Sequence, residues 1–234
     1  MGKVMYMRKG ESHSVPFACD PVFANNDWAK IVEACQKRRV PDTWTVGSQK
    51  AMMINGTSYM IDIIGRDHDN YSDGSGKAPL TFQMHDCYGV TYKINDSKTT
   101  SGGWTNCVMR QTHLPAIMAL MPSEVKSCIK EVNKLSTAGD LSSAVNTTKD
   151  KLFLLSEIEV VGSSLIGSYV GEGRQYAYYA AGNSRIKRLS GTNSDWWLRS
   201  PTQYANAFSF INYNGTNTYG YTNKSYGVAL AFCF

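Results

Sequence analysis

The segment from Thr202 to Tyr226 carries the side chains best suited to contact chemistry. Of its 25 residues, 16 are Asn, Tyr, Ser or Thr, and Lys224 is the only charged residue after Arg199. Tyrosine offers a large, rigid contact area with few torsions to freeze, and Asn, Ser and Gly supply adaptable hydrogen bonds, as in antibody paratopes. This composition predicts a surface that binds a ligand. The alternative is an ordinary polar hairpin face, because Thr and Tyr are also good strand residues.

The same segment has a strand pattern that would hold these side chains in place. Phe208 and Phe210 are two residues apart, and Asn214-Gly215 is a strong hairpin-turn signal. Successive side chains of a strand point to opposite faces, so the residues alternating with the two phenylalanines, together with the following loop, are expected to form the ligand surface. The predicted ligand-binding residues are Tyr204, Asn206, Ser209, Ile211, Asn212, Tyr213, Asn214, Asn217, Tyr219, Tyr221, Asn223, Ser225 and Tyr226.

Signatures of catalysis are absent from the sequence. There is no G-x-S-x-G nucleophile elbow, and none of the 4 histidines lies in a recognisable nucleophile motif. The Gly-rich stretches at 102–103 and 171–173 lack the strand-loop-helix context of a phosphate cradle. We therefore expect no enzymatic activity, no catalytic residue and no cofactor.

Two clusters contain residue types that ligate metals. His85-Asp86-Cys87 is the only tight one, and no second His/Cys pair lies at zinc-finger spacing, so we predict no metal there. Residues 67–74 are rich in Asp and Asn like a calcium loop, but counting from Asp69 the twelfth position is Leu80, where a bidentate Glu is required. Two readings of 67–74 stay open, namely a different oxygen-rich ion site and a turn whose side chains bond to its own backbone.

Composition excludes several classes of protein. Only 18% of the 234 residues are charged and 12% are aromatic, which argues against disorder, and no run of about 18 apolar residues predicts a membrane-spanning helix. The net charge of +5 is spread over scattered basic residues, with one cluster between Arg174 and Arg188, so we expect no nucleic-acid partner. The first residues lack the apolar core of a signal peptide, and the 6 widely spaced cysteines predict free thiols in a reducing compartment.

The elements expected to position these residues alternate between helix and strand. A helix capped near Asp27 carries the apolar stripe Trp28, Ile31, Val32 and Cys35, and a second helix from Pro122 carries Val125, Cys128, Ile129 and Val132. Strands are predicted at 58–64, 80–84, 151–155, 196–201 and 228–232, with a capping box at Ser156–Glu159. The polar stretch 136–150 is predicted as a long loop.

Several motifs together resemble an uncharacterised bacterial and phage domain marked by the sequence WWLRSP. They are Gly102-Gly103-Trp104 with Met109-Arg110, KLFLLSE at 151–157, WWLRSP at 196–201, and Gly227-Val228 with Ala231-Phe232. The resemblance runs from about Trp28 to the C-terminus. It departs near the end, where Ala229-Leu230 stand in place of a frequent Arg-Pro, so an arginine that could anchor the last strand is missing.

That domain is similar to the C-type lectin fold of formylglycine-generating enzymes and of variable proteins diversified by diversity-generating retroelements. The resemblance implies an α+β, C-type lectin-like fold with two helices, short antiparallel strands and much irregular loop. It implies an N-terminal extension over residues 1–24 and a single domain over 25–234, with a variable region at about 202–226. In such proteins, reverse transcription altered at template adenines turns Asn codons into Tyr, Ser, Thr and others, which is consistent with this composition.

The resemblance thus implies a display protein that binds an unknown protein or glycan receptor and inserts into no membrane. Its expected location is a phage virion, at the tail, or the bacterial cytoplasm or surface. Two alternatives stay open. An oxidase of the formylglycine-generating kind needs a pair of cysteines, for which Cys107 and Cys233 are the candidates. A plain glycan-binding, lectin-like module would use the same surface without diversification.

Overall fold

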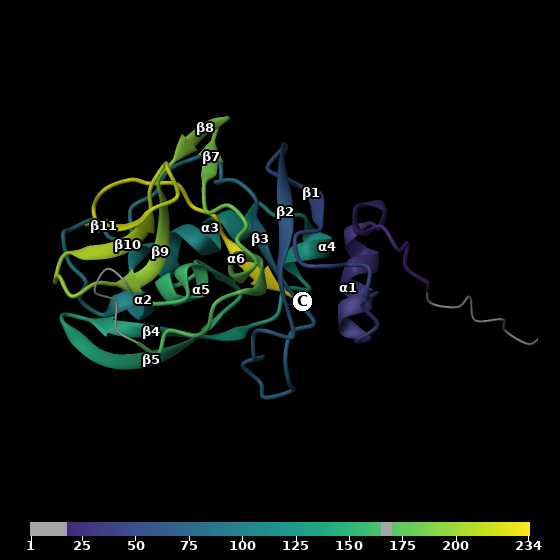
Figure 1. Cartoon of the computed structure of the whole chain (residues 1–234), viewed down its shortest axis with the longest axis horizontal. Coiled ribbons are helices and arrows are strands. Elements are labelled where there is room, and N and C mark those ends of the chain that lie inside the picture. Colours follow the sequence, from purple (N-terminus) through teal and green to yellow (C-terminus); the bar gives the residue numbers. More distant parts are fainter. Residues whose placement is uncertain (1–17, 165–169) are drawn as a thin grey trace, which may run out of the picture.

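The computed structural model describes residues 18–164 and 170–234 as short helices packed with several small antiparallel sheets (Figure 1). The predicted α+β class is confirmed. The expectation of two helices is wrong, because the described residues contain six short α-helices. Within these ranges, no helix has the length and apolar character needed to cross a membrane.

The largest sheet has five strands in the order β1-β2-β3-β12-β6. These strands are β1 (Gln49–Ile54), β2 (Thr57–Arg66), β3 (Leu80–Met84), β6 (Leu152–Phe153) and β12 (Ala231–Cys233). The C-terminal strand lies inside the sheet, since Phe232 pairs with Phe82 on one side and with Leu152 on the other. Residues 228–234 are all buried, so the last strand packs into the core without the arginine that the resemblance leads one to expect.

The helix predicted after Asp27 is confirmed as α1 (Trp28–Gln36), which packs against this sheet. The Asp27 side chain caps it by accepting a hydrogen bond from the Lys30 backbone amide at 2.6 Å. Trp28 packs edge-on against Phe82 at 5.8 Å between ring centroids. Phe23, in the short turn before the helix, is buried at 3% exposure against the same rings. Part of the predicted N-terminal extension therefore joins the core, while residues 1–17 lie outside the described residues.

The second predicted helix is wrong beyond its first turn. Helix α4 spans only Ser123–Lys126, and strand β4 (Val132–Gly139) begins where the helix was expected to continue. β4 pairs with β5 (Ser142–Asp150), so the stretch predicted as a loop is a hairpin. Burial along the first residues of β4 alternates with a period of two, and tertiary packing of that face overrides the helical spacing seen in the sequence.

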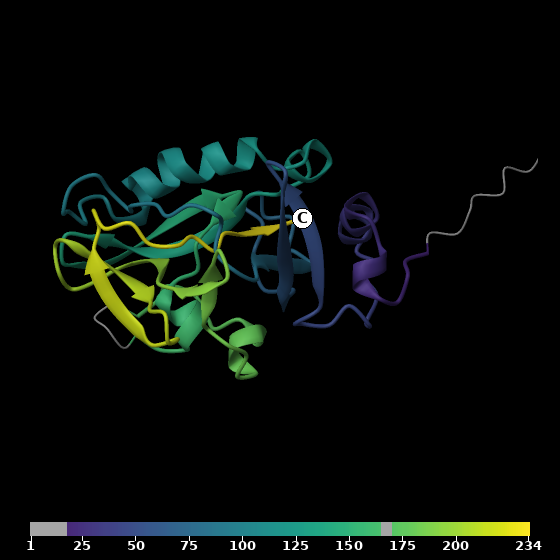
Figure 2. The same ribbon diagram turned by 90° about the horizontal axis from the view of Figure 1, so that it is seen from above.

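The remaining helices are short and mostly irregular. A π-helical stretch at Met109–His113 leads directly into α3 (Leu114–Ala119), and Figure 2 shows the two as one continuous rod along one side of the molecule. Helix α5 (Glu157–Val161) begins with the predicted capping box, in which Ser156 and Glu159 exchange side-chain to backbone hydrogen bonds at 3.1 Å. The other elements are α2 (Gly103–Asn106), α6 (Ala177–Ala180), β7 (Lys187–Leu189) and β8 (Thr192–Ser194).

A three-stranded sheet forms the end of the molecule opposite α1 (Figure 1). Its order is β11-β10-β9, with β9 at Trp196–Pro201, β10 at Ala207–Ile211 and β11 at Asn217–Tyr221. The predicted strand at 196–201 and the predicted hairpin turn at Asn214-Gly215 are both confirmed. Ser209 pairs with Tyr219 and Ala207 with Tyr221, so each pair projects from one face of the sheet.

Every residue of the WWLRSP strand is buried. Two of its side chains bond to distant backbone carbonyls: Trp196 Nε1 donates to Arg185 O and Trp197 Nε1 donates to Tyr92 O, each at 2.9 Å. Ser200 accepts a hydrogen bond from the Glu157 amide at 2.8 Å. The motif that marks the resemblance therefore forms internal contacts.

Arg199 of this strand is the first member of a buried charge network. Its guanidinium, at 0% exposure, bonds both oxygens of Glu159, with Nη1 to Oε2 at 2.5 Å and Nη2 to Oε1 at 2.8 Å. Lys134 Nζ then lies 2.6 Å from Glu159 Oε1 and 2.7 Å from Asp69 Oδ1. Burial opposes ionisation of Asp69, but the Lys134 charge overcomes it and holds the pKa of Asp69 at about 2. Two cations thus neutralise two carboxylates in the core.

Arg199→Leu is expected to lower the free energy of unfolding by about 3–5 kcal/mol, because it leaves Glu159 and the adjoining charges uncompensated in the interior. Chemical denaturation at neutral pH measures this loss. Arg39→Leu is the matched control, since Arg39 is exposed, and its effect should stay within about 0.5 kcal/mol. Equal, small effects of both substitutions would contradict the importance of the network.

Candidate functional site

The exposed tyrosines of the described chain are confined to one segment. Tyr204, Tyr213, Tyr219 and Tyr221 are 50%, 60%, 44% and 45% exposed, and within residues 18–164 and 170–234 no other tyrosine is as open to solvent. All four are among the predicted ligand-binding residues. Their position on the surface agrees with that prediction, while their role in binding stays a prediction.

Three of these tyrosines lie at one end of the β10–β11 hairpin. The Tyr204 and Tyr219 rings pack at 4.7 Å between centroids, and the side-chain interaction with Tyr204, which favours the protonated form of Tyr219, is the main cause that raises the pKa of Tyr219 above its usual value. Lys98, from the loop before α2, places Nζ 4.5 Å from the centre of the Tyr221 ring. We call Tyr204, Tyr219, Tyr221 and Lys98 the tyrosine surface.

Tyr213 lies apart from this group, at the tip of the hairpin. Its backbone amide donates to Asp195 Oδ1 at 2.8 Å, and in the described ranges its ring makes no contact with the other exposed tyrosines. Asn212 shapes the same tip, because its Oδ1 accepts hydrogen bonds from the amides of Asn214 at 3.2 Å and Thr216 at 2.9 Å. The structure therefore separates the predicted residues into a tyrosine surface and a hairpin tip.

The prediction that all the contact residues lie on the surface is wrong for three of them. Ser209 and Ile211 are 0% exposed and Asn217 is 7% exposed. The prediction assumed that β10 has one solvent face, but β10 is the central strand of its sheet and all its residues are buried, so both faces are covered. Asn217 Nδ2 donates to Glu157 Oε1 at 2.5 Å and so ties β11 to helix α5.

The other predicted residues differ in exposure. Asn214 and Ser225 are exposed, while Asn206, Asn212 and Asn223 are half-buried. Tyr226 is also half-buried, and its ring packs against Trp197 at 4.6 Å and Phe210 at 4.5 Å. Tyr226 is therefore mainly a packing residue beneath the hairpin.

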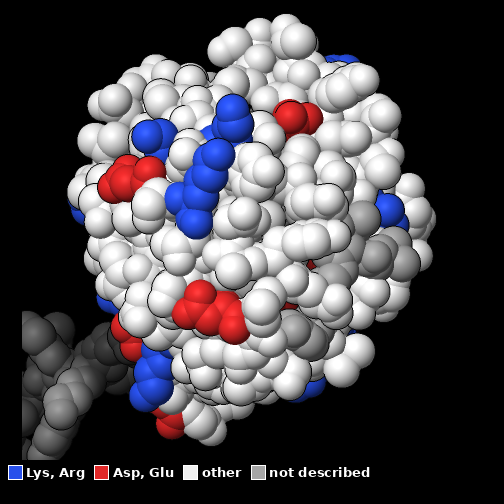
Figure 3. Space-filling view, turned by 90° about the vertical axis from the view of Figure 1, so that its left-hand side faces the viewer, with Lys and Arg blue, Asp and Glu red and all other residues white. Residues whose placement is uncertain are grey.

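Charge is sparse over this end of the molecule. Figure 3 looks onto it and shows a mostly uncharged surface, with a few separate groups of basic and acidic side chains. Lys187, a member of the basic cluster seen in the sequence, is only 3% exposed and donates to the carbonyls of Met84 and His85. The cluster between Arg174 and Arg188 is therefore not a continuous basic stripe.

The two cysteines considered for an oxidase are buried and free. Cys107 Sγ donates to Trp104 O at 3.3 Å, whereas Cys233 Sγ lies beside Thr81 Oγ1 at 3.5 Å. Burial raises the pKa of Cys107 to about 12 and raises the pKa of Cys233 as well. Neither site favours the thiolate that redox or copper chemistry requires.

The residues with metal-ligand chemistry are occupied by protein partners. Asp69 accepts hydrogen bonds from Lys134, Thr81 and Tyr176, and Asp73 Oδ1 accepts one from the Ser75 amide at 2.9 Å. These contacts support the turn reading of 67–74. Across the part of the chain that the structure describes, no group of three or more His, Cys, Asp and Glu side chains is placed to hold a metal ion.

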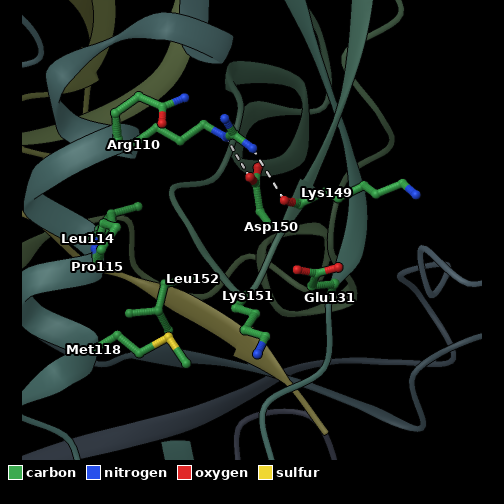
Figure 4. A pocket seen from close by; sticks show the side chains of 10 residues that line it. Arg110, Leu114, Pro115, Met118, Glu131, Lys149, Asp150, Lys151 and Leu152 are labelled. Atoms are coloured by element: carbon green, nitrogen blue, oxygen red, sulfur yellow. Dashed lines mark hydrogen bonds and ion pairs between the residues drawn. The ribbon is translucent and has the colours of Figure 1, made fainter.

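A hollow of about 280 Å³ lies between α3 and β5 (Figure 4). Its strongest polar groups are already paired, since Arg110 Nε lies 2.6 Å from Asp150 Oδ1 and Trp104 Nε1 donates to Asp150 Oδ2 at 2.9 Å. Trp104 and Arg110 belong to the motifs that carry the resemblance, and here they join α2 and the π-helical stretch to β5. The polar side chains of this hollow therefore serve to join these elements, and we do not take the hollow as the candidate ligand site.

The comparisons with known proteins give a family but no function. A family described as a domain of unknown function, DUF6273, matches residues 82–234, which is more than half of the chain. The chain belongs to this family. No curated protein and no solved structure matches it.

Tyr219→Ala is expected to change the free energy of unfolding by less than about 1 kcal/mol, whereas Tyr226→Ala should cost about 1–3 kcal/mol through lost packing on Trp197 and Phe210. Thermal and chemical denaturation of the two variants measure the difference. A large loss for Tyr219→Ala would show that this ring belongs to the core and not to a contact surface.

Proposed function

We propose that this chain is a display protein that binds a protein or glycan receptor through the tyrosine surface and the hairpin tip. The observation that carries the proposal is that, within residues 18–164 and 170–234, the exposed tyrosines are confined to residues 204–221. Exposed aromatic rings cost solvation free energy, and tyrosines with asparagines around them are typical of surfaces that exist to make contacts.

The hairpin has the construction that a display surface needs. Phe208 lies at 0% exposure and Phe210 at 7%, and Trp197 packs edge-on against Phe210 at 5.9 Å. The outward residues contribute little to this core, so they can change without loss of the fold. A rigid, preformed surface also pays less conformational entropy on binding.

The chemistry of the surface favours uncharged partners. Tyrosine rings stack on the apolar faces of sugars or fill pockets between protein side chains, and their hydroxyls bond at the rim. Lys98 adds one cation beside Tyr221. A partner with a flat apolar patch and a few hydrogen-bonding groups fits this surface best.

We further propose that the scaffold is C-type lectin-like and that the segment 202–226 is diversified by a retroelement. The composition of the segment and the WWLRSP-type resemblance support this proposal. Diversification at exposed positions would change the contact surface. At Ser209, Ile211 and Asn217, which lie in the interior, it would change the packing instead. A plain glycan-binding module without diversification is the second candidate, favoured by the same surface. An oxidase is disfavoured by the buried thiols with raised pKa values.

The flanking DNA distinguishes the two candidates. Diversification predicts a near-copy of the region encoding Thr202–Tyr226, which differs at adenines and lies beside a reverse transcriptase gene. Differences should include the codons of the exposed residues Tyr204, Tyr213, Tyr219 and Tyr221. Sequencing of the locus checks this, and the absence of any near-copy would leave the plain binding module.

Binding itself is tested with the double variant Tyr204→Ala/Tyr219→Ala on glycan arrays and on arrayed surface proteins. We expect the partners bound by the wild-type chain to lose at least about tenfold in affinity, because the two anchors are removed together. Met53→Ala/Met60→Ala is the control, since these residues are 52% and 41% exposed on β1 and β2, far from the hairpin (Figure 1). Equal loss in both double variants would contradict the proposed site.

A further inference from the structure

A second hollow, of about 240 Å³, lies beside the end of β3 and is independent of the tyrosine surface in its chemistry. It is walled by His85 and Asp86, by Tyr178 of α6, and by Ser184, Ile186 and Arg188 before and within β7. The sequence analysis placed His85-Asp86-Cys87 among potential metal ligands, but Cys87 is buried at 4% exposure. Of these three residues, His85 has a partly exposed side chain that is also paired with a buried carboxylate, that of Asp62.

The His85 ring is held by a buried carboxylate. Its Nδ1 lies 2.9 Å from Oδ2 of Asp62, which is 1% exposed in the middle of β2. Gln49 Nε2 donates to the other oxygen of Asp62 at 2.8 Å and lies 2.9 Å from His85 Nδ1. Because Nδ1 faces Asp62, Nε2 is the ring nitrogen left for the hollow, and the His85 side chain is 43% exposed.

The charges around the hollow favour a cationic imidazole. The hydrogen bond to Asp62 is the main cause that raises the pKa of His85, against the opposing effect of partial burial and of Lys187. Lys187 Nζ is engaged with the carbonyls of Met84 at 2.6 Å and His85 at 2.9 Å. When His85 is protonated, the local cations His85, Lys187 and Arg188 outnumber the carboxylates of Asp62 and Asp86.

Arg188 supplies the second open cation. Its backbone amide donates to Asp86 Oδ1 at 2.8 Å, which fixes the chain at the rim of the hollow. Its side chain is exposed, and the described residues give its guanidinium no hydrogen bond or ion pair. A guanidinium and an imidazolium on the wall of one small hollow form the usual donor set for an oxyanion.

We propose that this hollow binds a small oxyanion, a phosphate-like or carboxylate group, between His85 Nε2 and the Arg188 guanidinium. Ser184 lies on the same wall and carries a further hydroxyl donor. Binding requires protonated His85, so the site is occupied at mildly acidic pH and releases its anion as the pH rises through the raised pKa of His85.

The test is a titration with sodium sulfate and, separately, with sodium acetate, followed by calorimetry and by the NMR shifts of the His85 ring. Sulfate keeps its charge between pH 6 and 8.5, so a change in its affinity reports the protein alone. At constant ionic strength we expect binding at pH 6 and affinity weaker by about tenfold or more at pH 8.5, because one charge-assisted hydrogen bond is lost. Tighter binding of sulfate would indicate a phosphate-like ligand, and tighter binding of acetate a carboxylate.

Two variants locate the binding. His85→Gln should abolish the pH dependence and Arg188→Gln should weaken sulfate binding at pH 6 by about tenfold, because each removes one charge-assisted hydrogen bond, whereas Arg39→Gln, at an exposed arginine elsewhere, should bind like the wild type. Thermal unfolding checks that each variant folds, and Arg188→Gln carries the test alone if His85→Gln does not. Binding that is unchanged by pH and by both variants would mean an adventitious ion only and would overturn the proposal.

Discussion

The ion pair between Arg199 and Glu159 is the interaction on which the rest of the structure depends. It joins strand β9 to helix α5, and through Lys134 and Asp69 it reaches strand β4 and the loop before β3. Buried charges are tolerated only when each has a partner and the remaining donors are satisfied. Arg199 meets this condition, because its other N–H groups donate to the carbonyls of Leu135, Leu154 and Glu172. Four chain segments, namely β9, α5, β4 and the loop before β3, must therefore be in place together before these four charges neutralise one another.

This constraint explains why the WWLRSP motif is engaged in internal contacts along its whole length. Ser200 follows the buried Arg199 in WWLRSP, and it bonds Glu172 and the Glu157 amide inside the core. Glu172 also accepts from the Thr137 amide at 2.7 Å and the Thr137 hydroxyl at 3.0 Å. The motif holds one side of the three-stranded sheet, so the hairpin on the other side keeps its shape. The residues that carry the resemblance therefore contribute to the packing of the core, while the exposed tyrosines of the described chain lie on the hairpin side of the sheet.

Local patterns in the sequence predicted the elements that depend on local contacts. The capping box at Ser156 and the turn at Asn214-Gly215 are confirmed, because each depends on residues that are close in sequence. The strand at 80–84 is also confirmed, although it pairs with β2 and with the distant β12, because its composition suits a buried strand. The helix from Pro122 failed where β4 pairs with β5, since strand pairing there outweighs local spacing. The burial of Ser209 followed from the central place of β10 in its sheet, which no local pattern contains. Asp62 and His85 are 23 residues apart and meet only because β2 pairs with β3, so no local pattern predicts their contact.

The hairpin tip lies next to the hollow beside His85, and the two share a contact through Ile186. Gly215, at the tip, has φ of +85°, and a Cβ added to it would lie 3.2 Å from Ile186 Cγ1. Ile186 is itself part of the wall of the hollow, and Trp196 holds the same segment through its bond to Arg185 O. A larger residue at the tip would therefore press on the wall that faces His85 and Arg188. Sequence change in the hairpin thus reaches the oxyanion hollow through one contact, even though the tyrosine surface at the other end of β10 is separate from it.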